Sequence, residues 1–151
     1  MAGWTNKGKK NLIAALRGVA LPTNFYIALV TSAVAPTQDT NTKSELTEIA
    51  NGNGYTTGGI QLTKNSTDFD TLTEDDSLDK AFTQLKDIVW TASGGSLPAS
   101  GNGARYAILT DDNATQGSRE VWAYWSLGAD RTISVGQTLT LQDCELSLLE
   151  S

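Results

Sequence analysis

The chain has 151 residues, a length that suits one domain with a buried core. Its formal net charge is −6, which opposes binding to nucleic acid or anionic lipid, and no stretch has the length of a transmembrane helix. Histidine is absent and cysteine occurs once, which excludes Ser-His-Asp and Cys-His catalysis, a disulfide framework and an ordinary structural zinc site. We therefore expect no enzyme, no cofactor and no metal, and neither nucleic acid nor a membrane as a partner.

The first 20 residues predict a helical arm ahead of a main domain formed by residues 21–151. Within the arm, the segment Thr5–Gly18 begins with a good N-cap residue and ends with a good C′ residue. Leu12 and Leu16 belong to its short apolar stripe, and a helix this short needs a docking surface to be stable. The sequence leaves open whether the arm covers its own sheet or attaches the protein to a neighbour.

Two strands are predicted in the next part of the chain. Asn24–Thr31 follows a proline and is apolar on both faces. The segment Ser32–Ala50 is a loop rich in Thr, Asn and Pro, and a second strand is expected near Tyr55–Leu62. The glycine pair Gly58–Gly59 predicts a bulge or bend inside that strand.

Six carboxylates lie in the segment from Asn65 to Asp79. Hard cations prefer several oxygen ligands, so a calcium loop is one hypothesis, but the spacing differs from that of an EF-hand and no glycine supplies its sharp turn. We interpret the segment as a solvated acidic loop. The residues Asp111, Asp112 and Asn113 could also hold an ion, although β-turns select the same residue types.

A long hairpin gives the strongest pattern in the sequence. Apolar runs at Arg105–Leu109 and Val121–Leu127 flank a polar loop, which predicts two antiparallel strands. Strict alternation in the second run places Trp122 and Tyr124 on one face of the strand. The other face then carries Val121, Ala123, Trp125 and Leu127. A strand that is apolar on both faces must be covered on both, by the core on one side and by a helix, a second sheet or another protein on the other. Large aromatic residues such as Trp122 and Trp125 are also typical of an ordinary core.

Further short strands are predicted on either side of this hairpin. Ala81–Thr91 resembles one strand that ends near a tryptophan, and Thr138–Gln142 alternates with its leucines facing inward. Cys144 lies in an alternating apolar run, which favours a small buried core residue over a reactive thiol. Six or seven short strands with glycine-rich turns and one small helix are typical of an antiparallel β-sandwich, so we expect a mainly β fold.

Several segments follow one another in an informative order: KKNLIAAL (Lys9–Leu16), FYIALVT after Pro22 (Phe25–Thr31), EIANGNGY (Glu48–Tyr55), the strand ending in Val89–Trp90, RYAILTDDNATQG (Arg105–Gly117), WAYWSL (Trp122–Leu127) and RTISVGQTLTL (Arg131–Leu141). This order resembles that of a family of small tailed-bacteriophage virion proteins, labelled decoration, head or tail-fibre-like proteins. The resemblance spans nearly the whole chain, and each motif is a pattern of strands and turns.

The resemblance implies a structural protein of the virion. The leading hypothesis is a capsid decoration or cement protein on the outer capsid surface, bound across capsomers to the major capsid protein. Local threefold positions would favour a homotrimer. Such a protein gains its binding energy from apolar and aromatic contact. The candidate interface residues are Trp4, Lys9, Leu12, Leu16, Trp122 and Tyr124.

Two alternatives remain open at this stage. A tail component, such as a fibre, tube or baseplate protein, would show the same features and would bind other tail proteins. A glycan-binding β-sandwich module would use Trp122 and Tyr124 to stack on sugar rings, and a glycan hydrolase would add a pair of carboxylates, for which the sequence shows no spacing.

Overall fold

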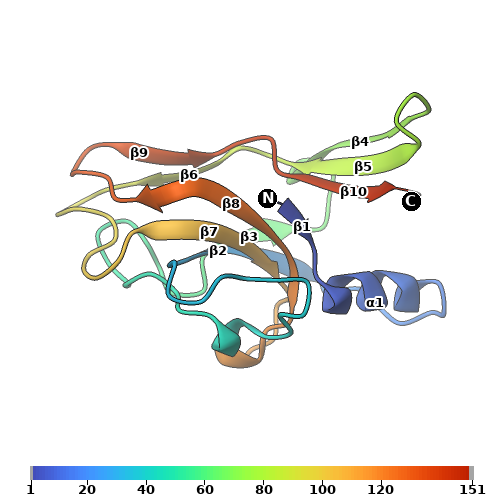
Figure 1. The fold of residues 1–151 in the computed structure, drawn as a ribbon, viewed down its shortest axis with the longest axis horizontal. Helices are drawn as coiled ribbons and strands as arrows, with labels where there is room; N and C mark the ends of the chain where they lie inside the picture. Colours follow the sequence, from blue (N-terminus) through green and yellow to red (C-terminus); the bar gives the residue numbers. More distant parts are fainter. Residues whose placement is uncertain (1, 150–151) are drawn as a thin grey trace.

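A computed structural model describes residues 2–149, which form two antiparallel β layers and one short helix (Figure 1). The helix α1 spans Asn6–Ala15, and no helix in the described part of the chain is long and apolar enough to cross a membrane. The strands are β1 (Ala2–Trp4), β2 (Asn24–Val30), β3 (Ile60–Thr63), β4 (Phe69–Asp75), β5 (Lys80–Leu85), β6 (Ile88–Thr91), β7 (Ala104–Thr110), β8 (Val121–Arg131), β9 (Thr138–Leu141) and β10 (Glu145–Leu149).

The first layer is a five-stranded sheet with the order β1-β8-β7-β2-β3. The second layer consists of two ribbons, the three-stranded β10-β5-β4 and the two-stranded β6-β9, which follow one another along the layer (Figure 1). The main core lies between the layers, where Leu29 and Trp125 of the first layer belong to one buried cluster with Leu85 and Trp90 of the second. The expected class, a mainly β antiparallel fold with a short helix near the N-terminus, is confirmed.

Residues 2–149 contain more strands than the six or seven expected. The predicted single strand Ala81–Thr91 is in fact two, because β5 pairs with β10 whereas β6 pairs with β9. The chain leaves one ribbon for the other at Lys86–Asp87. There the Lys86 ammonium forms an ion pair with Asp68, and the Lys86 N–H donates to the Asp68 carbonyl. The contacts of Lys86 with the distant residue Asp68 thus divide a run of sequence that reads as one strand.

The middle of the segment 65–79 is a strand, so the segment as a whole is not the solvated loop that its charge predicts. It contains β4, which pairs antiparallel with β5, and Thr71 and Thr73 are residues that favour strands. We call residues 69–85 the acidic hairpin. Its carboxylates do not converge, and within residues 2–149 no group of three or more His, Cys, Asp or Glu side chains is placed to hold a metal ion.

The N-terminal segment is built into the five-stranded sheet. Strand β1 pairs with β8, and the helix α1 follows directly. Thr5 is the N-cap, as predicted, and its hydroxyl accepts the N–H of Gly8. Gly18 has a φ of +82°, and the N–H of Val19 donates to the Ala14 carbonyl, which is the Schellman closure expected of a C′ glycine.

A β-bulge at Trp122 changes which side chains of β8 face the core. Leu109 pairs with Ala123, but Thr110 pairs with Val121, so Trp122 is an extra residue in the ladder. Trp122 therefore points into the main core together with Ala123, whereas Val121 points to the opposite face. The strict alternation that the sequence predicts is wrong at this position.

The bulge is held by the start of helix α1. The Trp122 carbonyl accepts the backbone N–H of Thr5 at 2.9 Å. Gly8 packs so closely on the same peptide that a Cβ there would lie 2.2 Å from the Trp122 oxygen. Glycine at position 8 therefore permits the helix to sit directly on the strand, at some cost in intrinsic helix propensity.

The second apolar face of β8 is covered by the chain itself. Residues 31–59, here called the covering loop, run between β2 and β3 and include a short 3-10 helix at Lys43–Glu45. Leu46 of the loop packs against a small buried cluster that contains Val121 and Tyr124. The alternative in which another protein must cover this face is therefore not needed.

Candidate interaction groove

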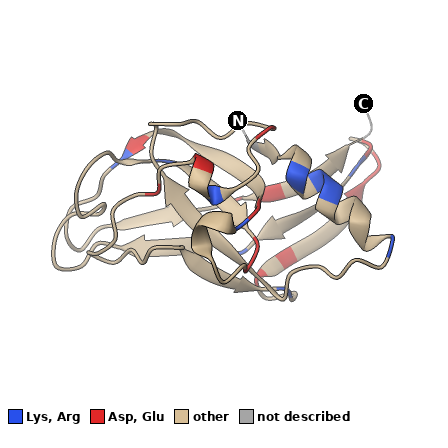
Figure 2. Ribbon diagram, turned by 90° about the horizontal axis from the view of Figure 1, so that it is seen from below, with Lys and Arg blue, Asp and Glu red and all other residues tan. Residues whose placement is uncertain are grey.

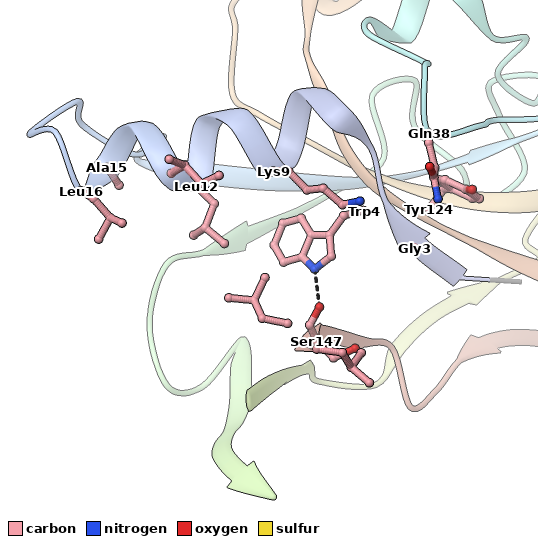
Figure 3. A pocket seen from close by; sticks show the side chains of 12 residues that line it. Gly3, Trp4, Lys9, Leu12, Ala15, Leu16, Gln38, Tyr124 and Ser147 are labelled. Atoms are coloured by element: carbon pink, nitrogen blue, oxygen red, sulfur yellow. Dashed lines mark hydrogen bonds between the residues drawn. The ribbon is translucent and has the colours of Figure 1, made fainter. Parts of the chain in front are cut away.

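An open apolar groove of about 820 Å³ lies where helix α1 diverges from strand β10 (Figure 3). One wall consists of α1 side chains, among them Lys9, Leu12 and Leu16. The other wall includes Ser147 and Leu148 of β10. The groove lies at the end of the β-sandwich where the two layers separate. The helix is on one side of it and the three-stranded ribbon on the other (Figure 1).

The helical wall follows from the spacing of its leucine and isoleucine residues. Leu12 is half-buried and packs against the main core. Ile13 and Leu16 extend the same stripe by one turn, but Leu16 has 88% of its surface exposed and Ile13 61%. The stripe therefore begins on the core and continues over solvent, which is uncommon for large aliphatic side chains.

The ribbon wall follows from the register of the three-stranded sheet. Leu146, Thr83 and Leu72 are direct cross-strand partners, so their side chains share one face. Leu146 is buried in the main core, while Leu148, two residues further along the same face, is more than half exposed. Leu72, on the edge strand β4 and outside the groove lining, is 84% exposed. The inner face of the ribbon thus leaves the core and remains uncovered.

Trp4 forms the floor between the two walls. Its indole Nε1 donates a hydrogen bond of 2.8 Å to the carbonyl of Ser147 (Figure 3). Its ring also packs against the main core. Because β1 belongs to the first layer and β10 to the second, this side chain joins the two layers and fixes the width of the groove at its base.

The rim of the groove on the helical side is positively charged in an acidic protein. Helix α1 and the turn after it carry four cations and no carboxylate between residues 6 and 18 (Figure 2). Lys7 pairs with Glu120 at 3.3 Å. The other three, Lys9, Lys10 and Arg17, form no ion pair with any residue in the range 2–149.

The groove gathers five of the six predicted interface residues, Trp4, Lys9, Leu12, Leu16 and Tyr124. Their role in binding stays a prediction. Two residues need a correction, because Trp122 is only 4% exposed and Tyr124 only 6%. The bulge turns Trp122 into the core, and Tyr124 lies under the covering loop, beside Gln38 (Figure 3). Trp122 therefore offers no surface for a partner, and Tyr124 reaches the groove with too little exposed surface to stack on a sugar ring.

Sequence reasoning missed the ribbon side of the groove. Leu148 belongs to an alternating run that extends from Cys144, so its inward-facing side was visible in the sequence. Leu72, on the same face of the ribbon but outside the groove, carried no such signal, because carboxylates and threonines surround it in the sequence.

A second cluster of functional groups closes the covering loop onto the sheet. The buried Lys43 ammonium pairs with Glu48, whose other oxygen accepts the Tyr55 hydroxyl and the Gly58 N–H. The Tyr55 oxygen in turn accepts the N–H of Leu29. Burial, with the Glu48 charge added, raises the pKa of Tyr55 far above its ordinary value. Each of these groups has partners within the cluster, so its chemistry serves to hold the loop.

The remaining candidate residues are structural as well. Burial and the nearby Asp143 raise the pKa of Cys144 to about 12, so its thiol stays protonated at neutral pH, and the expected buried core residue is confirmed. Asp111 accepts the N–H groups of Asn113 and Glu120, and Asp112 accepts the N–H of Asn24. These carboxylates therefore organise a turn.

The arrangement of the groove suits contact with another macromolecule. Aliphatic side chains dominate both walls, and the polar side chains along it, Lys9, Gln38 and Ser147, do not converge on one point. Comparisons with protein families, with curated proteins and with solved structures found no match to this chain. The residues and geometry described above are thus the basis for a functional proposal.

Proposed function

We propose that the chain is a structural protein of a tailed-bacteriophage virion, and specifically a decoration protein on the outer capsid surface. The observation that carries the proposal is the groove, an apolar surface with a basic rim that a single chain leaves open. The order of sequence segments, which resembles that of small phage virion proteins, supports the same function.

The exposed aliphatic side chains provide the energy for assembly. Complete burial of one such side chain contributes roughly 1.5–3 kcal/mol. Ile13, Leu16 and Leu148, which line the groove, together offer several times that amount. Association costs on the order of 4–15 kcal/mol in lost freedom, so one groove alone gives weak binding. A symmetric shell repeats the contact, and linked contacts convert weak binding into stable attachment.

The charge of the chain fits a position outside the shell. A net charge of −6 disfavours contact with packaged nucleic acid. Three cations without ion-pair partners in residues 2–149 lie beside the groove, Lys9 and Lys10 on helix α1 and Arg17 just after it, and they can select an acidic neighbouring surface.

The test is to locate the protein on particles produced from the genome that encodes it. We expect cryo-electron microscopy to show density for the β-sandwich on the outer capsid surface, and mass spectrometry to find the chain in purified particles. Density confined to the tail would contradict decoration and favour a fibre, tube or baseplate component. Absence of the chain from purified particles would contradict any virion role.

Variants test whether the groove is the assembly surface. Leu16→Asp places a charge on the most exposed residue of the helical wall, and we expect it to lower occupancy on the particle by at least about tenfold, which corresponds to roughly 1.4 kcal/mol. Val135→Asp is the matched control, because Val135 is also an exposed aliphatic residue but lies in the turn between β8 and β9, at the other end of the molecule (Figure 1). Equal occupancy of both variants would exclude the groove.

A further inference from the structure

We infer that the occupant of the groove is the acidic hairpin of a second copy of this chain. The inference rests on the proposed function, because it names the partner of the same groove. It assigns two surfaces of one molecule to each other, so the protein would assemble into a closed oligomer before or during attachment.

The acidic hairpin combines negative charge with exposed aliphatic side chains. Glu74, Asp76 and Asp79 form no ion pair with any residue in the range 2–149. Leu78 in the turn and Leu72 in β4 are both mostly exposed. The acidic hairpin therefore exposes leucine side chains that carboxylates surround.

Hydrogen bonds within the turn hold the tip of the acidic hairpin in one conformation. The Asp75 carboxylate accepts both the N–H and the hydroxyl of Ser77, and the Leu78 N–H donates to the Asp75 carbonyl. At the base, the Lys80 ammonium binds Glu145 of β10 at 2.9 Å. A fixed turn loses little conformational freedom on binding, which lowers the cost of association.

The groove has the complementary character at each point. Its helical wall offers Ile13 and Leu16 as apolar contacts and Lys9 as a cation. Lys10 of the same helix and Arg17 just after it lie outside the lining, and none of the three cations has an ion-pair partner among residues 2–149. The apolar side chains of the hairpin can thus meet those of the helix while opposite charges meet around them. This combination of an apolar centre and a charged rim is typical of specific interfaces.

The position of the two surfaces permits a symmetric exchange. The acidic hairpin and helix α1 both project from the same end of the molecule, on opposite sides of the groove (Figure 1). Each copy can therefore donate its hairpin and accept one, reciprocally around a twofold axis or cyclically around a threefold axis. Either arrangement closes, and no copy is left with an unfilled groove.

The experiment measures the mass of the full chain in solution by light scattering and sedimentation. We expect the wild type to form a dimer or trimer that dissociates as salt approaches 1 M, where the screening length falls to about 3 Å. Lys9→Glu with Lys10→Glu and Arg17→Glu should give monomers, and so should Glu74→Lys with Asp76→Lys. Circular dichroism and thermal unfolding check that each variant is folded.

The decisive variant combines all five charge reversals. Because helix and hairpin then exchange signs, we expect the oligomer to return, which a mere loss of stability or solubility would not produce. Asp130→Lys is the control, since Asp130 is an exposed carboxylate near the end of β8 away from the groove. It should leave the mass unchanged.

The outcomes separate this inference from the proposed function. A wild-type chain that is monomeric at every concentration overturns the inference that a second copy fills the groove. A variant with all five charge reversals that stays monomeric overturns it as well. If that monomer still decorates capsids through its groove, the shell protein is the occupant and the proposed function stands. If the oligomer and the charge exchange are found but purified particles lack the protein, the proposed function fails and the self-association stands.

Discussion

The covering loop and the groove are two solutions to the same problem, an apolar surface that a β layer cannot hide alone. The covering loop hides the outer face of β8 within one chain, and its polar groups Lys43, Glu48 and Tyr55 satisfy one another. At the groove, the layers separate and leucines remain in solvent. A completed polar network marks a surface that is closed within the chain, whereas exposed leucines beside cations without ion-pair partners in the described chain mark one that needs a partner.

The comparison makes its largest prediction for Lys43→Met. The Lys43 and Glu48 side chains are only 8% and 13% exposed, so removing the cation leaves a buried carboxylate without its partner. We expect the free energy of unfolding to fall by about 3–5 kcal/mol, as measured by urea denaturation followed by tryptophan fluorescence. Adding Glu48→Gln should recover part of the loss, because the neutral amide removes the buried charge. A loss below about 1 kcal/mol would mean that the pair behaves as if it were exposed.

Gly8→Ala tests how closely the helical wall of the groove sits on β8. Alanine favours a helix by about 1 kcal/mol over glycine, but its Cβ would lie 2.2 Å from the Trp122 carbonyl oxygen. We expect the clash to dominate and to lower the free energy of unfolding by about 1–3 kcal/mol. Lys10→Ala, on an exposed position of the same helix, should change it by less than about 0.5 kcal/mol. A stabilised Gly8→Ala variant would contradict this docking.

Trp4→Phe tests the link at the base of the groove. Phenylalanine keeps an aromatic ring but cannot donate to the Ser147 carbonyl. We expect a loss of about 1 kcal/mol in the free energy of unfolding. We also expect faster amide hydrogen exchange in β1 and β10, while exchange in β2 and β7 stays unchanged. Unchanged exchange in β1 and β10 would show that the indole does not join the layers.

The ion pair between Asp68 and Lys86 gives a smaller effect that depends on pH. Hydrogen bonding to the Lys86 ammonium lowers the pKa of Asp68 below its ordinary value of 3.8. Because the folded state binds this proton less readily than the unfolded chain, the stabilisation is complete above the ordinary pKa and is lost as pH falls through the lowered one. The advantage of the wild type over Asp68→Asn in thermal unfolding should therefore shrink below pH 3.8. An advantage that does not decrease at all as pH falls below 3.8 would contradict this cause.

Local sequence signals predicted those features that depend on neighbouring residues. The cap at Thr5, the C′ glycine at Gly18 and the pairing of β7 with β8 follow from residue types and short spacings. The bulge at Trp122 does not, because it forms where Thr5, the cap of a helix far away in the chain, donates its backbone N–H. The break after β5 likewise depends on Asp68, and the register that exposes Leu72 depends on pairing between three strands.

The same distinction explains the candidate site. The stripe that contains Leu12 and Leu16 was visible from helical spacing, so half of the groove was predictable. The sequence pattern predicted Trp122 and Tyr124 as interface residues because it cannot show that a bulge turns Trp122 into the core or that the covering loop folds over Tyr124. Exposure is a property of the whole fold, and composition alone assigns it poorly.

Of all these variants, Leu16→Asp should change the stability of the fold least. It also tests most directly the contrast between the covering loop and the groove. Leu16 is 88% exposed, so the change should alter the free energy of unfolding by less than about 0.5 kcal/mol. Leu12→Asp, one turn earlier on the same wall, buries a charge against the main core and should be destabilising by several times that amount. A surface with no role in folding should lose only association when it is charged. If Leu16→Asp instead destabilises the protein as much as Leu12→Asp, the groove is filled by the chain itself in solution. The contrast between the covering loop and an open groove would then be wrong.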